Sequence, residues 1–291
     1  MVVCVVLAVL AAAANAAGSV LQRQAARNEP ADGHLTIRLL WDLAKQPAWG
    51  FGVTSMVAGS VLQALALAAG PIVLVQPILI GELAFVLVLT AILRRRRLGL
   101  GEWLPVAGVG GGVVVLLAAL RPSGGDPLAA PAGGWLAGCL TTTTLVAVLV
   151  HRGAAVSAGG RRALLLGSAA GAWFGFTAVL VSAVMAAVRD PSATVLSTWQ
   201  FYAVLVAAPL GFFLLQNTLR AGSLTASQPG LILVNPLVAL LWGVAVFGEN
   251  VRGGAWVLLE LGAGAAIVAG TIGLARSPLL AAHERAGSPS S

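Results

Sequence analysis

The chain is poor in charged residues, cysteine and histidine, and each scarcity argues against a class of protein. Only 9% of its 291 residues are charged, whereas soluble domains carry roughly 25%, so the chain cannot cover a water-facing surface. Its two cysteines, Cys4 and Cys139, lie in apolar runs, which argues against a disulfide framework or a thiolate metal site. Its three histidines lie in expected loops and tails, so we expect no hydrolase triad, no cofactor and no enzyme.

Apolar residues are abundant instead. They make up 58% of the chain, and the mean hydropathy is +0.94. Because about 20 apolar residues cross a bilayer as a helix, the sequence predicts an all-α polytopic membrane protein whose partner is the lipid bilayer. Nine transmembrane helices are expected, at residues 2–22, 48–69, 71–93, 102–120, 134–151, 163–188, 198–217, 223–247 and 255–275.

Three segments need a separate interpretation. The first apolar run has no Lys or Arg before it, as a cleaved signal peptide normally has, so we interpret it as a helix. Residues 23–47 are amphipathic, and we expect part of them to lie in the membrane interface. Residues 277–291 are rich in Ser, Pro and Ala and are expected to form a disordered cytoplasmic tail.

The basic residues predict an orientation. The net charge is +7, and 14 of the 17 Lys and Arg residues fall on one side of the expected helices, including the run 94–97. Basic loops favour the cytoplasmic side, so we expect the N-terminus outside and the C-terminus inside the cell membrane. This distribution explains the charge without a nucleic-acid partner.

The two halves of the chain align with each other at an offset of about 152–153 residues. The matching positions are Gln63 with Gln216, Gln76-Pro77 with Gln228-Pro229, Glu82 with Asn235, Gly101 with Gly254, and Trp103 with Trp256. The first four helices therefore match the last four, and the unpaired fifth helix inverts the second set in the membrane. Inverted repeats with proline-interrupted helices are a common plan of secondary transporters.

The repeat divides the chain into four parts. Residues 1–122 form the first repeat, and residues 123–162 connect it to the second through the fifth helix. Residues 163–276 form the inverted repeat, and the tail follows. Gly108 and Gly112 form a small-residue pair in the fourth helix, which suits internal packing better than a homodimer, although both uses remain open.

The motifs resemble those of the drug/metabolite transporter superfamily, and within it those of NIPA-type magnesium transporters and their bacterial EamA-like relatives. The matching stretches are residues 18–27, the entry of the second helix at Trp49, residues 64–77, and residues 216–229. The resemblance implies a nine-helix inverted-repeat fold. The chain departs from the NIPA pattern at residues 78–80, and an arginine run replaces an acidic residue after the third helix.

Polar side chains inside apolar spans mark candidate sites, because each is costly in a bilayer. Glu82 lies near the centre of the third span, and Asn235 beside Pro236 is its repeat mate. Glu82 is a candidate cation ligand or proton-coupling group, and a hydrogen-bonded neutral Glu82 is the structural alternative. The full set of candidate substrate or ion ligands is Glu82, Asn235, Gln76, Gln228, Gln63, Gln216, Asn217, Asn15 and Glu260.

Two cargo classes remain open at this stage. The first is a divalent cation such as Mg²⁺, which prefers carboxylate oxygens and keeps several waters; Glu82 would be its ligand. The second is a drug or metabolite exported in exchange for protons, with Glu82 as the proton-linked group. A membrane scaffold or lipid-handling protein without transport activity is the third alternative.

Overall fold

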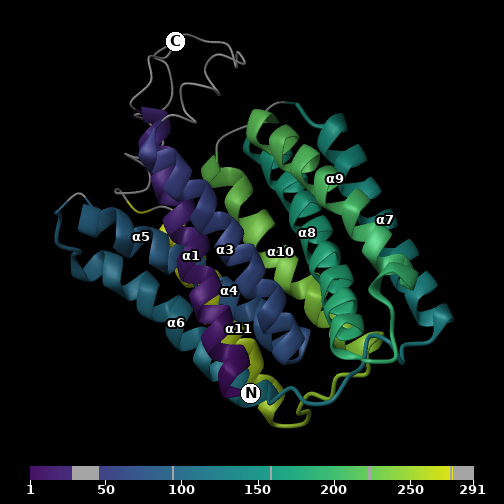
Figure 1. The fold of residues 1–291 in the computed structure, drawn as a ribbon. Coiled ribbons are helices and arrows are strands. Elements are labelled where there is room, and N and C mark those ends of the chain that lie inside the picture. Colours follow the sequence, from purple (N-terminus) through teal and green to yellow (C-terminus); the bar gives the residue numbers. More distant parts are fainter. Residues whose placement is uncertain (28–45, 94, 158, 222–223, 276, 278–291) are drawn as a thin grey trace.

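The computed structural model describes residues 1–27, 46–93, 95–157, 159–221, 224–275 and 277 (Figure 1). Most of the expected interfacial segment and nearly all of the expected tail therefore lie outside the described residues. Within them the secondary structure is helical, with one isolated β-bridge between Ser123 and Asn250. The elements are α1 Val2–Arg27, α3 Pro47–Ala69, α4 Ile72–Leu79, α5 Glu82–Leu93, α6 Leu100–Leu120, α7 Ala132–Ala155, α8 Gly160–Arg189, the 3₁₀ helix η1 Val195–Ser197, α9 Trp199–Ala221, α10 Leu224–Ala245 and α11 Trp256–Ala275.

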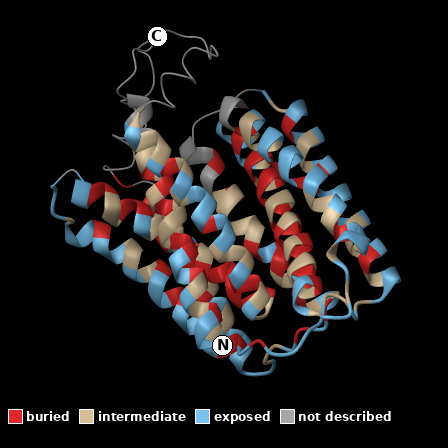
Figure 2. Cartoon of the chain, viewed as in Figure 1, coloured by how far each residue is buried: buried red, intermediate tan, exposed pale blue. Residues whose placement is uncertain are grey.

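The surface of this bundle is apolar. Eight spans in the described part of the chain are long and apolar enough to cross a membrane, and α10 adds a shorter apolar stretch, Pro229–Ala245. Large apolar side chains are exposed on the outer helices, for example Leu104 at 72% and Leu258 at 75%, and Figure 2 shows exposed residues along the outer faces of α6, α7 and α9. Such a surface fits lipid rather than water, so the chain is an integral membrane protein.

Residues 71–93 form one span, as expected, but two helices. The amides of Ile80, Gly81 and Leu83 donate to carbonyls three residues earlier, at 3.2, 3.0 and 3.3 Å, which is the spacing of a 3₁₀ turn. Pro77 lies just before this turn, and its carbonyl accepts the first of these three bonds. The break at residues 80–81 therefore separates α4 from α5 near the middle of the span.

Glycines let three helix pairs approach closely. α1 packs on α3, α8 on α10, and α6 on α11. A Cβ atom added to Gly171 of α8 would lie 2.5 Å from the carbonyl oxygen of Leu231, and one added to Gly112 of α6 would lie 3.0 Å from that of Ala263. These backbones therefore touch, as small residues in membrane helices allow, and Gly112 packs inside the protomer.

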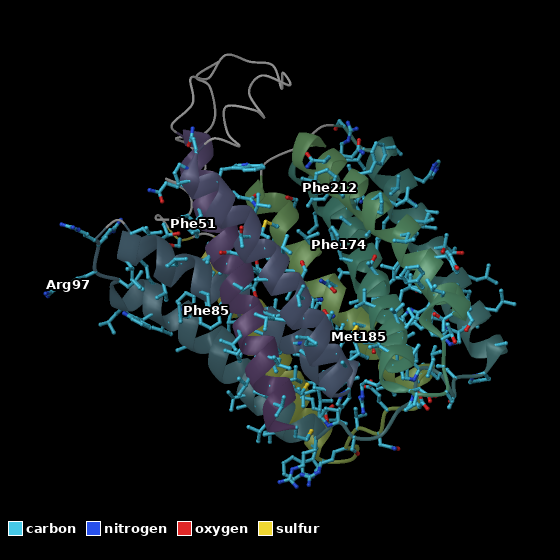
Figure 3. All side chains as sticks on the ribbon, viewed as in Figure 1. Phe51, Phe85, Arg97, Phe174, Met185 and Phe212 are labelled. Carbon is cyan, nitrogen blue, oxygen red and sulfur yellow. The ribbon has the colours of Figure 1, made fainter. Side chains whose placement is uncertain are left out.

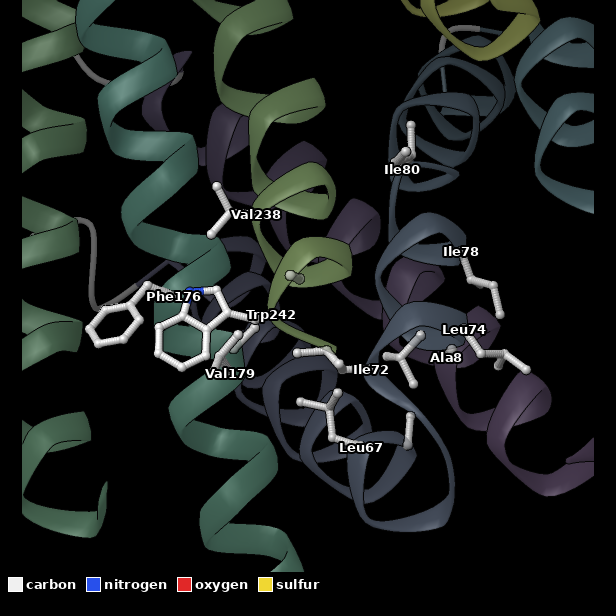
Figure 4. Close-up of a cluster of buried hydrophobic side chains, with 14 of the residues drawn as sticks. Ala8, Leu67, Ile72, Leu74, Ile78, Ile80, Phe176, Val179, Val238 and Trp242 are labelled. Carbon is white, nitrogen blue, oxygen red and sulfur yellow. The ribbon is translucent and has the colours of Figure 1, made fainter. Parts of the chain in front are cut away.

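α4 and α10 lie at the centre of the bundle. α4 contacts α1 and α10, and α10 contacts α8 on its other side; in Figure 1, α5 and α6 flank this centre on one side and α7 to α9 on the other. Figure 3 labels the aromatic side chains Phe51 and Phe85 on the first side and Phe174 and Phe212 on the second. The largest buried cluster includes Ile72 of α4, Val179 of α8 and Trp242 of α10 (Figure 4). The centre is therefore a packed junction between the two halves of the chain.

Candidate functional site

The candidate site lies where α4 and α10 meet. Both helices contain proline, Pro77 in α4 and Pro229 and Pro236 in α10. A proline inside a helix lacks its own N–H and disturbs the turn before it. Prolines are tolerated in membrane helices where neighbouring groups satisfy the freed backbone carbonyls, so the contact between these two helices is a place where polar groups can be accommodated.

Gln76 of α4 and Asn235 of α10 are polar side chains on these two contacting helices. The Gln76 side chain is 1% exposed, and its Nε2 atom is buried without a hydrogen-bond partner. The Oδ1 atom of Asn235 is buried and unpartnered as well. A buried polar group without a partner costs about 1–3 kcal/mol. A donor and an acceptor are therefore available for a ligand on two helices that contact each other.

Glu82 lies on the far side of the helix break from Gln76. It is the first residue of α5 and is half-buried. The free N–H groups of a first helical turn favour a negative charge there. The break thus places a carboxylate at mid-span, next to the end of the helix that carries the buried amide.

The other predicted residues are spread over the bundle. Asn15 is half-buried between α1 and α3, where its side chain would meet a Cβ atom on Gly59. Asn217 is exposed, and its Nδ2 donates to the carbonyl of Phe213 at 2.8 Å, which is a bond within its own helix. Gln63 and Gln216 are half-buried on α3 and α9. These four residues therefore lie on α1, α3 and α9, and none of them is on α4 or α10.

Two predicted residues remain. Glu260 is half-buried on α11, and its Oε1 is buried without a partner. Its helix, α11, packs most extensively on α6 and also contacts α5 and α10. The side chain of Gln228 lies outside the described residues. Among the described residues, no three His, Cys, Asp or Glu side chains gather to form a metal site.

Glu249 is a buried carboxylate that sequence reasoning missed. It lies in the loop between α10 and α11 and is 6% exposed. Its Oε1 accepts the backbone N–H of Ile72 at 2.8 Å, and its Oε2 accepts that of Val73 at 3.0 Å. Burial raises the pKa of the Glu249 carboxyl above its ordinary value, while the two backbone hydrogen bonds act in the opposite direction. The only signal in the sequence is a single acidic residue in a short loop that follows Gly248.

An aromatic group joins the unpaired helix α7 to the centre. Trp242 Nε1 on α10 donates to Thr142 Oγ1 on α7 at 2.9 Å. The Trp135 ring on α7 lies 5.2 Å from the Trp242 ring, and Phe176 on α8 lies 5.5 Å from it. Offset and edge contacts between aromatic rings stabilise such clusters. α10 is therefore held on this side by α7 and α8 together.

Comparison with known proteins gives one informative similarity. No family model matches the chain, and no solved structure matches it. The chain is 30% identical, over 287 residues, to the protein printed as "Uncharacterized protein Cgl0250/cg0304" from Corynebacterium glutamicum, an alignment that covers 96% of this chain and 98% of that protein. The whole membrane bundle is thus shared, and the chain belongs to the same protein family as Cgl0250/cg0304.

Proposed function

We propose that this membrane protein is a secondary transporter of the drug/metabolite transporter superfamily. It moves a small solute or cation by alternating access through a site at the α4–α10 crossing. The observation that carries the proposal is the pair of buried, unpartnered amide atoms on Gln76 and Asn235. A membrane protein with no cargo would gain stability by replacing or pairing these groups.

The helix contacts support an inverted repeat. In the proposed nine-span arrangement, α1, α3, α4 with α5, and α6 correspond to α8, α9, α10 and α11. α1 contacts α3, α4 and α5, and α8 contacts both of the matching helices, α9 and α10. α4 contacts its counterpart α10, and α6 contacts its counterpart α11. The proposed unpaired helix is α7, and the proposed orientation has the basic loops in the cytoplasm of a cell membrane.

The two halves pack differently, which supports alternating access. α1 packs most extensively on α3, whereas α8 packs most extensively on α10 rather than on α9. In an inverted repeat, two halves that exchange such packings open a central site first to one side and then to the other. The structure would then be one of two states, with the second reached when the packings are exchanged.

The polar groups on α4, α5 and α10 favour an organic cargo. An amide donor and an amide acceptor suit a solute with hydrogen-bonding groups, and Glu82 supplies a carboxylate for a proton or a cationic group. A dehydrated divalent cation needs more oxygen ligands than one carboxylate. Hydrated Mg²⁺ is the second candidate, because this ion keeps several waters and uses one or two carboxylates.

Replacing the carboxylate tests the proposal. Glu82→Gln keeps the size of the side chain but removes its charge, and Asp126→Asn is the matched control in an exposed loop. Proteoliposomes with a pH dye and a magnesium dye are loaded with candidate solutes. We expect E82Q to abolish the solute-dependent proton movement and D126N to retain it. Mg²⁺ flux lost in E82Q would favour the second candidate, and unchanged flux of every kind would refute a role of Glu82 in transport.

A further inference from the structure

The loop between α10 and α11 closes over the beginning of α4. Ile72 and Val73 belong to the first turn of α4, where backbone N–H groups have no partner within the helix. Pro71 at the N-cap position provides no side-chain cap. The Glu249 carboxylate supplies both hydrogen bonds instead, from 177 and 176 residues away in the sequence. The cap of a helix in the first half is therefore a side chain of the second half.

The carboxylate fits a closely enclosed place. A Cβ atom added to Gly125 would lie 2.4 Å from Glu249 Cγ, and one added to Gly243 would lie 2.8 Å from Glu249 Oε2. The loop that holds Glu249 is in turn fixed by the α6–α7 loop. Ser123 and Asn250 exchange two backbone hydrogen bonds, at 3.1 and 2.9 Å, so three segments meet around this one side chain.

The basic side chains of this end have other contacts. Arg252 lies over the Trp256 ring, 4.9 Å from its centroid, and Arg189 donates to the carbonyl of Ala68. Arg121 is exposed, and only its backbone N–H caps α6, by donating to the carbonyl of Leu117. From α1, the Cys4 thiol lies close enough for the charge of Glu249 to act on it. Glu249 is thus held by backbone N–H groups, and these belong to α4.

α4 is short and held at both ends. Its eight residues run from the Glu249 cap to the break at residues 80–81, and Gln76 lies between them. We infer that Glu249 is a positioning residue that holds the N-terminal end of α4 against the α6–α7 and α10–α11 loops, a contact that we call the latch. Release of the latch opens that end of the bundle toward Gln76. The opening of a solute path rests on the proposed function, whereas the latch itself is a property of the fold.

Cys4 is a native reporter for the latch. It is fully buried, and its Sγ donates to the carbonyl of Ala66 at 3.4 Å. A Cβ atom on Gly70 would lie 2.6 Å from the same Sγ, so Cys4 covers the α3–α4 junction directly before the capped turn. A C139S chain leaves this thiol as the only one. Its reaction with a charged, membrane-impermeant maleimide reports water access to this junction.

The experiment compares labelling rates in reconstituted full-length protein at one pH. E249A removes both hydrogen bonds, and we expect Cys4 to label about tenfold faster or more, because two bonds to a charged group are lost. E249Q keeps an acceptor and should label within about threefold of the parent chain. D126N changes the charge of the neighbouring loop without touching α4 and should label at the parent rate.

Two further variants separate the latch from a loss of folding. G243A keeps the carboxylate and is expected to accelerate Cys4 labelling as E249A does, because its methyl group would lie 2.8 Å from Glu249 Oε2 and 2.7 and 3.0 Å from the Val73 and Ile72 side chains of α4. A second buried reporter, S182C in a C4S/C139S chain, lies in α8, where Ser182 is 4% exposed. Combined with E249A, this reporter should stay protected if only the latch opens.

The outcomes are distinct. Parent-like labelling of Cys4 in both E249A and G243A overturns the latch, and so does equal acceleration at Cys4 and at the α8 reporter. Because labelling needs no transport, the latch can hold even if E82Q leaves every flux unchanged. Loss of flux in E82Q with parent-like labelling in both E249A and G243A would keep the proposed function and remove the latch.

Discussion

Replacing Gln76 by Met is expected to stabilise the protein and abolish its transport. Met has nearly the size of Gln and is flexible enough to fill the same space. The change removes the buried Nε2 atom that has no partner. If Gln76 is retained for a cargo rather than for the fold, its loss should help the fold and harm the function.

The magnitude follows from the two ends of the amide. Removing an unsatisfied buried group recovers about 1–3 kcal/mol. Losing a hydrogen bond at the amide oxygen would cost about 0.5–1.5 kcal/mol. The expected net change therefore lies between a loss of about 0.5 and a gain of about 2.5 kcal/mol. Its centre is a gain of about 1 kcal/mol, and the unfolding midpoint rises on the order of 2 °C per kcal/mol gained.

The assay is thermal unfolding of the purified protein in detergent, followed by tryptophan fluorescence, with transport in proteoliposomes as the second readout. Thr90→Val is the matched control, because Thr90 is equally buried at 1% exposure but its Oγ1 donates to the Val86 carbonyl at 2.7 Å. T90V should not raise the midpoint and should transport normally. A loss of more than about 1 kcal/mol in the free energy of unfolding of Q76M would refute the reasoning, since Gln76 would then be a satisfied structural residue.

Two further expectations concern Glu249 and the glycine contacts. Because burial raises the pKa of Glu249 in the folded protein, the folded state binds this proton more tightly than the unfolded chain. Wild type should therefore lose stability relative to E249Q as the pH rises from about 4.3 toward neutrality; a pH series of unfolding midpoints with the opposite slope would contradict this. Gly171→Ala should destabilise the protein by about 1–3 kcal/mol, because its Cβ would meet the Leu231 carbonyl at 2.5 Å. Gly110→Ala, in open space within a helix, should not destabilise the protein and should stabilise it by up to about 1 kcal/mol, because Ala favours a helix over Gly. Equal effects of the two substitutions would count against close backbone packing of α8 on α10.

The helical spans could be predicted well because the bilayer dictates their length. The expected spans 48–69 and 255–275 correspond to α3 Pro47–Ala69 and α11 Trp256–Ala275. The break between α4 and α5 was not predicted, because Ile80 and Gly81 fit the apolar pattern around them. Pro77 was visible in the sequence, but whether a proline kinks a helix or ends it depends on the neighbours that receive the freed groups.

The site could be predicted only in part. Gln76 and Asn235 stood out because an amide in an apolar run is unusual. One amide atom of each is buried without a partner, and their role as ligands stays a prediction. Asn217 had the same signal, yet it bonds its own helix, because sequence does not tell which face of a helix meets the centre. Glu249 was missed because its partners are the backbone N–H groups of Ile72 and Val73, which every residue type except proline carries.

The Glu249 cap also sets an order of assembly. Ile72 and Val73 leave the ribosome 177 and 176 residues before the carboxylate that will bind them. At about 5–20 residues per second, α4 waits roughly 9–35 seconds with its first turn uncapped. The first half of the chain therefore cannot reach its final form during its own synthesis. Completion of α4 depends on the last loop to be made, so a ribosome that stops before residue 249 releases a bundle whose central helix is still open to water or to a chaperone.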